Sequence, residues 1–259
     1  MNNRLVIKVG TSTLAHSTGL INLRNIEDIV KVVSDLKNMG KEIILVTSGA
    51  IGVGFGKLGI TDRPSDIPSR QAAASVGQCA LMYIYDKLFS EYGHTVAQIL
   101  LTGDVLEDEI RAMNVKNTFT KLFEMTAVAI VNENDTVATE EIEFGDNDML
   151  SALVAKLVSA DKLIILSDID GLYDKNPREH PSAKLIRDVY EIDETIVSSA
   201  ERKGSHLGTG GMYTKVRAAQ IACSEGIDTH IINGSTPELL YTLLTNSPAG
   251  TTFHRKEQE

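Results

Sequence analysis

The 259-residue chain has few of the features that mark specialised classes of protein. Its two cysteines, Cys79 and Cys223, lie in apolar stretches without paired spacing, so we expect reduced, packed thiols with no catalytic role in a cytosolic protein. The longest uncharged stretches, residues 43–56 and 71–85, fall short of the roughly 18 apolar residues that a membrane-spanning helix needs. The first apolar run is short and interrupted by Lys8, unlike a secretory signal. We therefore expect a cytoplasmic protein without a membrane segment.

The chain also lacks an excess of basic residues. The 25 Lys and Arg residues stand against 35 Asp and Glu residues, which gives a formal net charge of −10. The summed field of such a chain repels nucleic acid and anionic membranes, so we expect neither as a partner. An anionic substrate would need a locally positive site.

Three familiar site signatures are incomplete. A P-loop requires Ser or Thr after Gly56-Lys57, where this chain has Leu58. A calcium-binding loop could begin at the sequence SDIDG, but Leu172 and Tyr173 then occupy positions that need a ligand and a glycine. The six histidines are scattered and lack metal-ligand spacing. These absences argue against a Walker ATPase, an EF-hand and a His/Cys metal centre.

The glycines that are present allow two interpretations. Gly54, Gly56 and Gly59 satisfy GxGxxG, but they begin several residues after the preceding predicted strand, and no ribose-binding acid ends a second strand. An NAD-dependent dehydrogenase is therefore a remote alternative. The other interpretation is a mobile glycine loop over a cleft, which begins at residues 47–50, where the small residues of the sequence TSGA would let a ligand approach closely.

Apolar runs of strand length alternate with longer helical patterns along the chain. The runs are nearly continuous, which is typical of parallel strands covered on both faces. They lie at residues 5–9, 42–46, 95–101, 127–131, 163–166 and 229–232. Apolar residues recur at helical spacing over 26–36, 70–90, 115–125, 147–158, 212–226 and 237–244. The pattern predicts an α/β fold, a three-layer α/β/α sandwich around a mainly parallel central sheet.

Two irregular segments interrupt this alternation. Residues 136–144 alternate like a short hairpin, and residues 171–189 carry two prolines and several charges, so they should form a protruding loop or hairpin. No repeat, low-complexity tract or linker divides the chain. We expect a single domain over residues 1–259, with two lobes around a cleft.

Two lysines in glycine-rich turns, near opposite ends of the chain, are the most informative feature. Lys8 stands in LVIKVGTS and Lys215 in GTGGMYTK. Each alone could be a solvated surface residue. Together they indicate phosphoryl transfer, because turns without bulky side chains bring backbone N–H groups against a phosphate and ammonium groups neutralise the charge that moves.

Amides and carboxylates cluster where predicted strands end. One cluster is NENDT after the strand at 127–131, and GDND opens the helix at 147–158. These groups could bind an ammonium group, hold Mg²⁺ through water, or orient the lysines, although Asp146 or Asn147 could equally be a simple helix cap. Ser167 and Asp168 likewise could either contact a nucleotide or form a plain turn.

The motifs KVGTS, TSGAI, NENDTV, GDND, SDIDGLYDKNP and GTGGMYTK resemble, in order and spacing, those of the glutamate 5-kinase family within the amino acid kinase superfamily. The resemblance covers nearly the whole chain. It implies ATP-dependent phosphorylation of the γ-carboxylate of L-glutamate, the first step of proline biosynthesis, with the two ligands at the carboxyl edge of the sheet. Longer bacterial members append a PUA domain, which we expect to be absent here.

The resemblance also implies roles for individual residues. The expected catalytic residues are Lys8, Lys215 and Asp148. Glutamate would be bound by Ser48, Gly49, Asn132, Asn134, Asp135 and Asn147. ATP would be bound by Lys8, Gly10, Ser167, Asp168, Thr209, Gly210, Gly211, Met212 and Lys215. No protein ligand to Mg²⁺ is expected, because ATP would hold most of its coordination sphere.

Partners follow from the same resemblance. We expect proline as a feedback inhibitor, handover of the unstable acyl phosphate to glutamyl phosphate reductase, and a homo-oligomer, either a dimer or a tetramer. Within the superfamily, aspartate or N-acetylglutamate are alternative substrates. A catalytically silent amino-acid-binding regulatory protein is a third alternative, against which the presence of Lys8, Lys215 and Asp148 argues.

Overall fold

The strands form one mainly parallel sheet. The structure is a computed structural model that describes residues 4–16, 20–137, 147–201, 211–245 and 247–256. The strand order is β3 (Val96–Leu101), β4 (Val128–Glu133), β2 (Glu42–Val46), β1 (Arg4–Val9), β5 (Lys162–Ser167), β7 (Asp228–Asn233), β8 (Thr251–Phe253) and β6 (Asp188–Val189). Every pairing is parallel except that of β7 with β8. The six predicted strands are confirmed, and the short β6 and β8 lie outside the predicted set.

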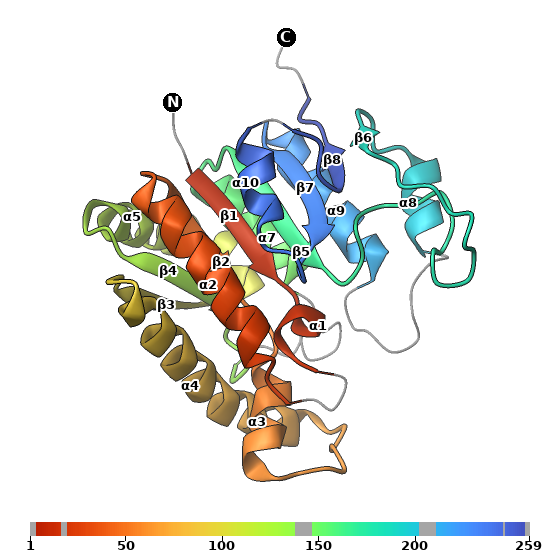
Figure 1. The fold of residues 1–259 in the computed structure, drawn as a ribbon. Helices are drawn as coiled ribbons and strands as arrows, with labels where there is room; N and C mark the ends of the chain where they lie inside the picture. Colours follow the sequence, from red (N-terminus) through yellow and green to blue (C-terminus); the bar gives the residue numbers. More distant parts are fainter. Residues whose placement is uncertain (1–3, 17–19, 138–146, 202–210, 246, 257–259) are drawn as a thin grey trace.

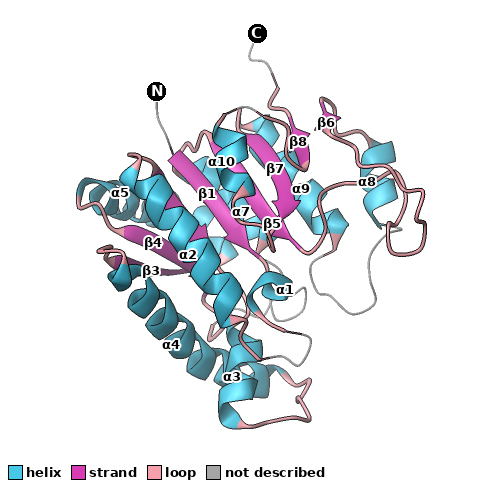
Figure 2. Ribbon diagram, in the orientation of Figure 1, coloured by secondary structure: helices cyan, strands magenta, loops and turns pink. Residues whose placement is uncertain are grey.

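Helices cover both faces of this sheet (Figure 1). Alternate residues of β1 point to opposite faces. Leu5, Ile7 and Val9 pack with α1 (Thr11–Leu14), α2 (Leu23–Asn38), α4 (Ile67–Glu91) and α10 (Leu239–Leu244). Val6 points the other way and packs with α5 (Glu109–Glu124), α7 (Asp148–Leu157), α8 (Glu194–Glu201) and α9 (Met212–Ser224). Figure 2 shows the strands between these helices, and the predicted three-layer α/β/α sandwich is confirmed.

Local capping explains where helices begin and end. The side chain of Asn22 accepts a hydrogen bond from the backbone N–H of Asn25 and starts α2, and Gly40 follows its end with a φ of 84°. Helix α5 begins several residues earlier than predicted, because the carboxylate of Asp108 accepts from the backbone N–H groups of Ile110 and Arg111. A 3-10 turn, η1 (Gly103–Leu106), precedes it.

The glycine-rich stretch after β2 is a helix, so both interpretations given above are wrong. Helix α3 (Ala50–Leu58) contains Gly54, and Gly59 ends it in the left-handed region, with a φ of 69°. A Cβ on Gly54 would lie 1.8 Å from the carbonyl oxygen of Ala73 in α4, and a Cβ on Gly77 would lie 1.8 Å from that of Ala50. These glycines let α3 and α4 pack at backbone contact, which fixes the position of the residues at the start of α3.

The segment 171–189 forms the protruding hairpin that its composition predicts. Its two sides are joined by hydrogen bonds from the backbone N–H of Asp174 to the oxygen of Lys184 and from that of Ile186 to the oxygen of Leu172. It projects beside α8 at the edge of the molecule (Figure 1). Most of the hairpin predicted at 136–144 lies outside the described residues.

The two cysteines differ in exposure. Cys223 is buried, as predicted, and burial raises the pKa of its thiol to about 11. Cys79 is exposed on α4, so the expectation of a packed thiol is wrong there. Among the described helices, none has the length and apolar character needed to cross a bilayer.

Candidate active site

The central feature of the site is one carboxylate that contacts both lysines. The Oδ1 atom of Asp148 lies 2.7 Å from Nζ of Lys8, and its Oδ2 atom lies 3.0 Å from Nζ of Lys215. Thr214 also donates its hydroxyl to Oδ2, at 2.9 Å. All three charged side chains are buried, with relative exposures of 2%, 6% and 0% for Lys8, Lys215 and Asp148. The two lysines, distant in sequence, therefore meet at one point.

The fold explains this meeting. Side chains of β1 alternate between the two faces of the sheet, so Lys8 points to the same face as Val6, which packs among residues of α7 and α9. Asp148 is the first residue of α7, and Lys215 lies in the first turn of α9. Buried charges are stable only when paired and hydrogen-bonded, so this arrangement is a costly feature that packing alone does not require.

A second group of polar side chains is buried without hydrogen-bond partners. It comprises Ser48 after β2, Asp135 after β4 and Asn147 just before α7. The Oγ of Ser48 and the Oδ1 atoms of Asp135 and Asn147 have no partner in the described part of the chain. Buried acceptors of this kind are rare in folded proteins, and a ligand that donates hydrogen bonds would satisfy them.

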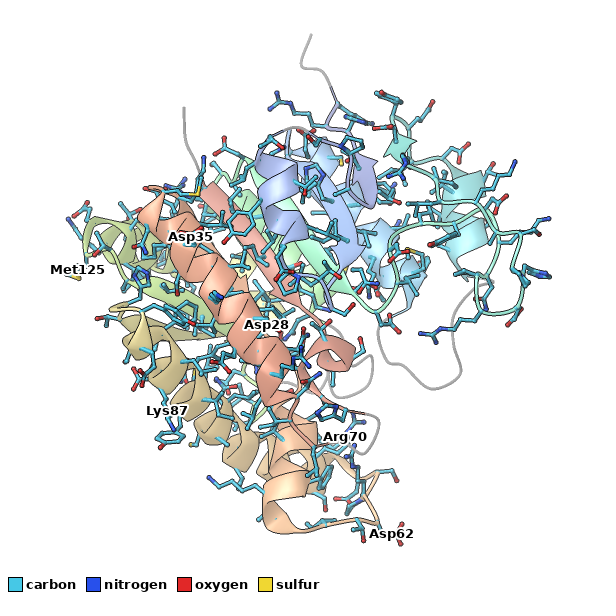
Figure 3. All side chains as sticks on the ribbon, in the orientation of Figure 1. Asp28, Asp35, Asp62, Arg70, Lys87 and Met125 are labelled. Carbon is cyan, nitrogen blue, oxygen red and sulfur yellow. The ribbon has the colours of Figure 1, made fainter. Side chains whose placement is uncertain are left out.

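Burial also perturbs Asp135. It raises the pKa of this carboxyl from 3.8 to about 6, and the positive charge of Arg70 opposes the shift. Arg70 lies near the start of α4 and is labelled in Figure 3 below α1. A cationic ligand group beside Asp135 would favour the ionised carboxylate that burial disfavours.

Asn147 is fixed by its amide nitrogen. The Nδ2 atom donates to the backbone oxygen of Thr47 at 2.5 Å and to Oδ1 of Asn132 at 2.7 Å. Its side chain makes no capping hydrogen bond to α7, so the capping alternative is wrong for Asn147. Asp146 lies outside the described residues. Because both N–H groups of the amide are used, the carbonyl oxygen of Asn147 is the atom left for a ligand.

A pocket on the other side of the lysine pair follows the end of β5. Its lining includes Ser167, Asp168, Arg178, Gly211, Met212 and Lys215. The guanidinium of Arg178, from the hairpin at 171–189, forms an ion pair with Asp168. Since Lys215 both lines this pocket and contacts Asp148, the pocket and the lysine pair form one continuous site.

Two further predicted residues can be placed, and two cannot. Gly10 lies next to Lys8, since a Cβ on Gly10 would be 3.5 Å from Nζ of Lys8. Gly49 precedes α3 with a φ of 88°, a conformation that favours glycine. Thr209 and Gly210 lie outside the described residues.

Asn134 differs from the other predicted glutamate ligands. Its Oδ1 accepts from the hydroxyl of Thr136 at 2.5 Å, and its backbone N–H donates to Leu101. The first contact belongs to a local turn and the second continues the pairing of β4 with β3, so the binding role of Asn134 stays a prediction. Sequence reasoning missed Gln78 and Arg178, which reach the site through contacts between segments that the sequence does not bring together.

Metal ligation by the protein is not favoured by the local donor set. Among the described residues, no group of three or more His, Cys, Asp or Glu side chains could hold a metal ion. Both oxygens of Asp148 already contact lysines, and Asp168 contacts Arg178. The residues that are described therefore fit Mg²⁺ that is carried by nucleotide phosphates better than Mg²⁺ that is held by protein carboxylates.

Comparison with known proteins identifies relatives of this architecture. The model of the amino acid kinase family matches residues 3–233. The chain is 53% identical to the glutamate 5-kinase of Clostridium perfringens, with 100% of this chain and 97% of the relative covered. It is 51% identical to the glutamate 5-kinase of Listeria innocua, with 100% and 95% covered.

Solved structures with the same fold are much more distant in sequence. A carbamate kinase from Giardia lamblia, described as bound to AMP-PNP, superposes with a TM-score of 0.68 at 14% identity and covers 98% of this chain and 99% of its own. An isopentenyl phosphate kinase superposes with a TM-score of 0.67 at 16% identity, with 96% and 99% covered. The fold, the family model and the close relatives lead to one conclusion: this chain belongs to the amino acid kinase family.

Proposed function

We propose that this protein is a glutamate 5-kinase, which transfers the γ-phosphoryl group of ATP to the γ-carboxylate of L-glutamate and forms L-glutamyl 5-phosphate and ADP. This is the first step of proline biosynthesis. The observation that carries the proposal is the contact of Asp148 with both Lys8 and Lys215, between the pocket after β5 and the buried acceptors near Ser48. The close relatives named glutamate 5-kinase support the choice of substrate.

In the proposed reaction, a γ-carboxylate oxygen attacks the γ-phosphorus of ATP, and the bond from that phosphorus to the bridging oxygen of ADP breaks. The carboxylate is anionic at neutral pH, so no general base is needed. Catalysis then depends on alignment and on reducing the repulsion between two anions. Lys8 and Lys215 flank the transferred group, Asp148 positions them, and the backbone N–H groups of Gly10 and Gly49 add hydrogen-bond donors.

Glutamate recognition uses the buried acceptors. The α-ammonium group of the substrate donates to the carboxylate of Asp135 and to Oδ1 of Asn147, and Ser48 contributes its hydroxyl. Asn132 supports Asn147 from behind, and Asn134 shapes the turn that carries Asp135. Glutarate carries the same two carboxylates but no ammonium group, so it would leave these acceptors unsatisfied, which accounts for selection of the amino acid.

ATP occupies the pocket after β5. Ser167 and Asp168, together with residues 211–215 at the start of α9, hold its phosphates and ribose, and Lys215 reaches the γ-phosphate. Thr209 and Gly210 remain predicted ATP ligands. Mg²⁺ enters with ATP and supplies neutralisation of phosphate charge when bound. The protein contributes the lysines and the oriented backbone.

Trapping with hydroxylamine tests this proposal, because an acyl phosphate gives a stable hydroxamate. We expect product with ATP and L-glutamate and little with L-aspartate or N-acetylglutamate. Lys8→Ala and Lys215→Ala should each lower kcat on the order of a hundredfold. Lys156→Ala is the matched control, since Lys156 is an exposed lysine of α7 that pairs with Glu225 on the surface. Product from aspartate or N-acetylglutamate but not from glutamate would contradict the proposal.

Regulation and partners form a further part of the proposal. Proline acts as a feedback inhibitor that competes near the glutamate site, and glutamate saturation curves with and without proline test this. The acyl phosphate is handed to glutamyl phosphate reductase, because it hydrolyses in water. The enzyme works in the cytoplasm as a homo-oligomer, a dimer or a tetramer, which light scattering of the purified protein would distinguish.

A further inference from the structure

A chain of side-chain amides connects the surface to the proposed glutamate site. At the outer end, Nε2 of Gln78 in α4 donates to Oε1 of Gln98 in the edge strand β3, at 3.2 Å. Next, Nδ2 of Asn132 in β4 donates to Oε1 of Gln78, at 2.8 Å. Asn147 then donates to Oδ1 of Asn132, at 2.7 Å. Four side-chain amides from four segments thus form a chain in which each amide donates to the next one toward the surface.

The direction of these bonds determines which atom Asn147 presents to a ligand. An amide has donors on its nitrogen and an acceptor on its oxygen, so each partner fixes the orientation of the next. Asn132 can accept from Asn147 because its own nitrogen is turned toward Gln78. The Oδ1 atom of Asn147 is consequently directed away from these partners, where it is buried and unpartnered.

Gln78 provides the acceptor that keeps Asn132 in this orientation. Asn132 is buried, with a relative exposure of 2%, so water cannot readily replace a lost partner. Without the oxygen of Gln78, the Asn132 amide would leave a buried N–H unsatisfied or rotate, and a rotated amide would present its nitrogen to the nitrogen of Asn147. Among the described residues, the contact with Thr47 would then be the one hydrogen bond left to the side-chain amide of Asn147.

We infer that Gln78 is a positioning residue for substrate binding, which acts on glutamate through Asn132 and Asn147 without touching it. The inference rests on the proposed function, since it concerns the group that receives the α-ammonium of glutamate. Gln78 lies on α4, which the close packing of Gly54 and Gly77 fixes against α3. The same helix contact therefore holds both the Ser48 turn and the amide chain in register.

The test compares two substitutions that differ in the acceptor oxygen. Gln78→Met keeps the length of the side chain but removes the acceptor, whereas Gln78→Glu retains an oxygen for Asn132. We expect Gln78→Met to raise the KM for L-glutamate about three- to tenfold, while the KM for ATP is unchanged and kcat changes little. Gln78→Glu should restore a KM within about twofold of the wild type.

A matched control and a second ligand separate positioning from a general loss of structure. Ser75 lies on the same helix, where its exposed hydroxyl donates to the backbone oxygen of Gln71, so the KM values of Ser75→Ala should equal those of the wild type. Binding of glutarate, which lacks the ammonium group, should be weak and equal in wild-type protein and Gln78→Met, measured by calorimetry. If Gln78→Met does not fold, Gln78→Ala removes the same acceptor without adding bulk.

The outcomes distinguish this inference from the proposed function. A wild-type protein that does not phosphorylate glutamate contradicts the proposed function. A wild-type protein that does so, with variants whose KM for glutamate is unchanged, contradicts the role of Gln78. Equal changes in both KM values, or a Gln78→Glu variant as impaired as Gln78→Met, would also overturn that role, because a lost acceptor could then not be the cause.

Discussion

Replacement of Asp148 by asparagine tests the lysine pair most thoroughly, because Asp148→Asn keeps the size of the side chain and removes only its charge. In the wild type, each carboxylate oxygen contacts one ammonium group, at 2.7 and 3.0 Å. Asparagine can accept at one oxygen but places an N–H group toward the other lysine. The substitution therefore removes the negative charge of Asp148 from beside both buried ammonium groups.

The expected magnitude follows from the burial of this trio. Removing one partner of a buried ion pair typically costs about 3–5 kcal/mol, against roughly 0–1 kcal/mol for an exposed pair. Asp148 has no exposed surface, whereas Asp104 and Arg111 form a pair in which both side chains are more than half exposed. Asp104→Asn is therefore the matched control, with the same chemical change at an exposed site.

Two assays are needed to separate stability from catalysis. Urea denaturation should show a loss of about 3–5 kcal/mol for Asp148→Asn and less than about 1 kcal/mol for Asp104→Asn. The hydroxamate assay, at a temperature where circular dichroism shows both variants folded, should show kcat lowered on the order of a hundredfold for Asp148→Asn alone. A folded Asp148→Asn protein with near wild-type kcat would refute the catalytic part of the reasoning, and unchanged stability would refute the energetic part.

Three other predictions concern the proton, the helix contact and the nucleotide pocket. The KM for glutamate should rise about tenfold per pH unit below pH 6, because the raised pKa of Asp135, about 6, lets protons compete with the substrate ammonium; Asp135→Asn should weaken binding and flatten this profile. Because the pKa of Asp135 is raised in the folded state, the ionised carboxylate destabilises the folded protein above pH 6, and this destabilisation is lost as the pH falls. Asp135→Asn should therefore raise the thermal midpoint at pH 7. Gly54→Ala should lower the free energy of unfolding by about 1–3 kcal/mol, because the added methyl group collides with α4. Gly52 lies in the same helix but faces open space, so Gly52→Ala should raise the free energy of unfolding by about 0.5–1 kcal/mol. Equal effects of the two substitutions in denaturation curves would count against the close packing. Arg178→Ala should raise the KM for ATP severalfold and leave that for glutamate unchanged, and the reverse pattern in steady-state kinetics would contradict the assignment of the two pockets.

Sequence patterns predicted the elements that carry a strong local signal in their own residues. The strands of the sheet centre are buried on both faces, so their apolar runs are unambiguous, as at β1 and β5. Helix α2 has a regular apolar stripe and an asparagine cap. The polar residues at the strand ends could be predicted to gather, because parallel strands end at one edge of the sheet.

The remaining parts depend on tertiary contacts that no local pattern contains. Helix α3 carries glycines, which disfavour a helix, and the close contact with α4 that explains Gly54 cannot be seen in the local sequence. Strands β6 and β8 have two and three residues, too few for a pattern. Gln78 is an ordinary helical glutamine until β4 is placed beside α4.

The central claim is that Lys8 and Lys215 act on the same phosphoryl group, and a double-mutant cycle on kcat tests it most directly. The measurement compares Lys8→Met, Lys215→Met and the double variant in the hydroxamate assay. Since both ammonium groups contact Asp148, we predict that each single change costs on the order of a hundredfold and that the double change costs far less than the product of the two. Two effects that multiply fully, or a lysine whose removal leaves kcat unchanged, would contradict the account.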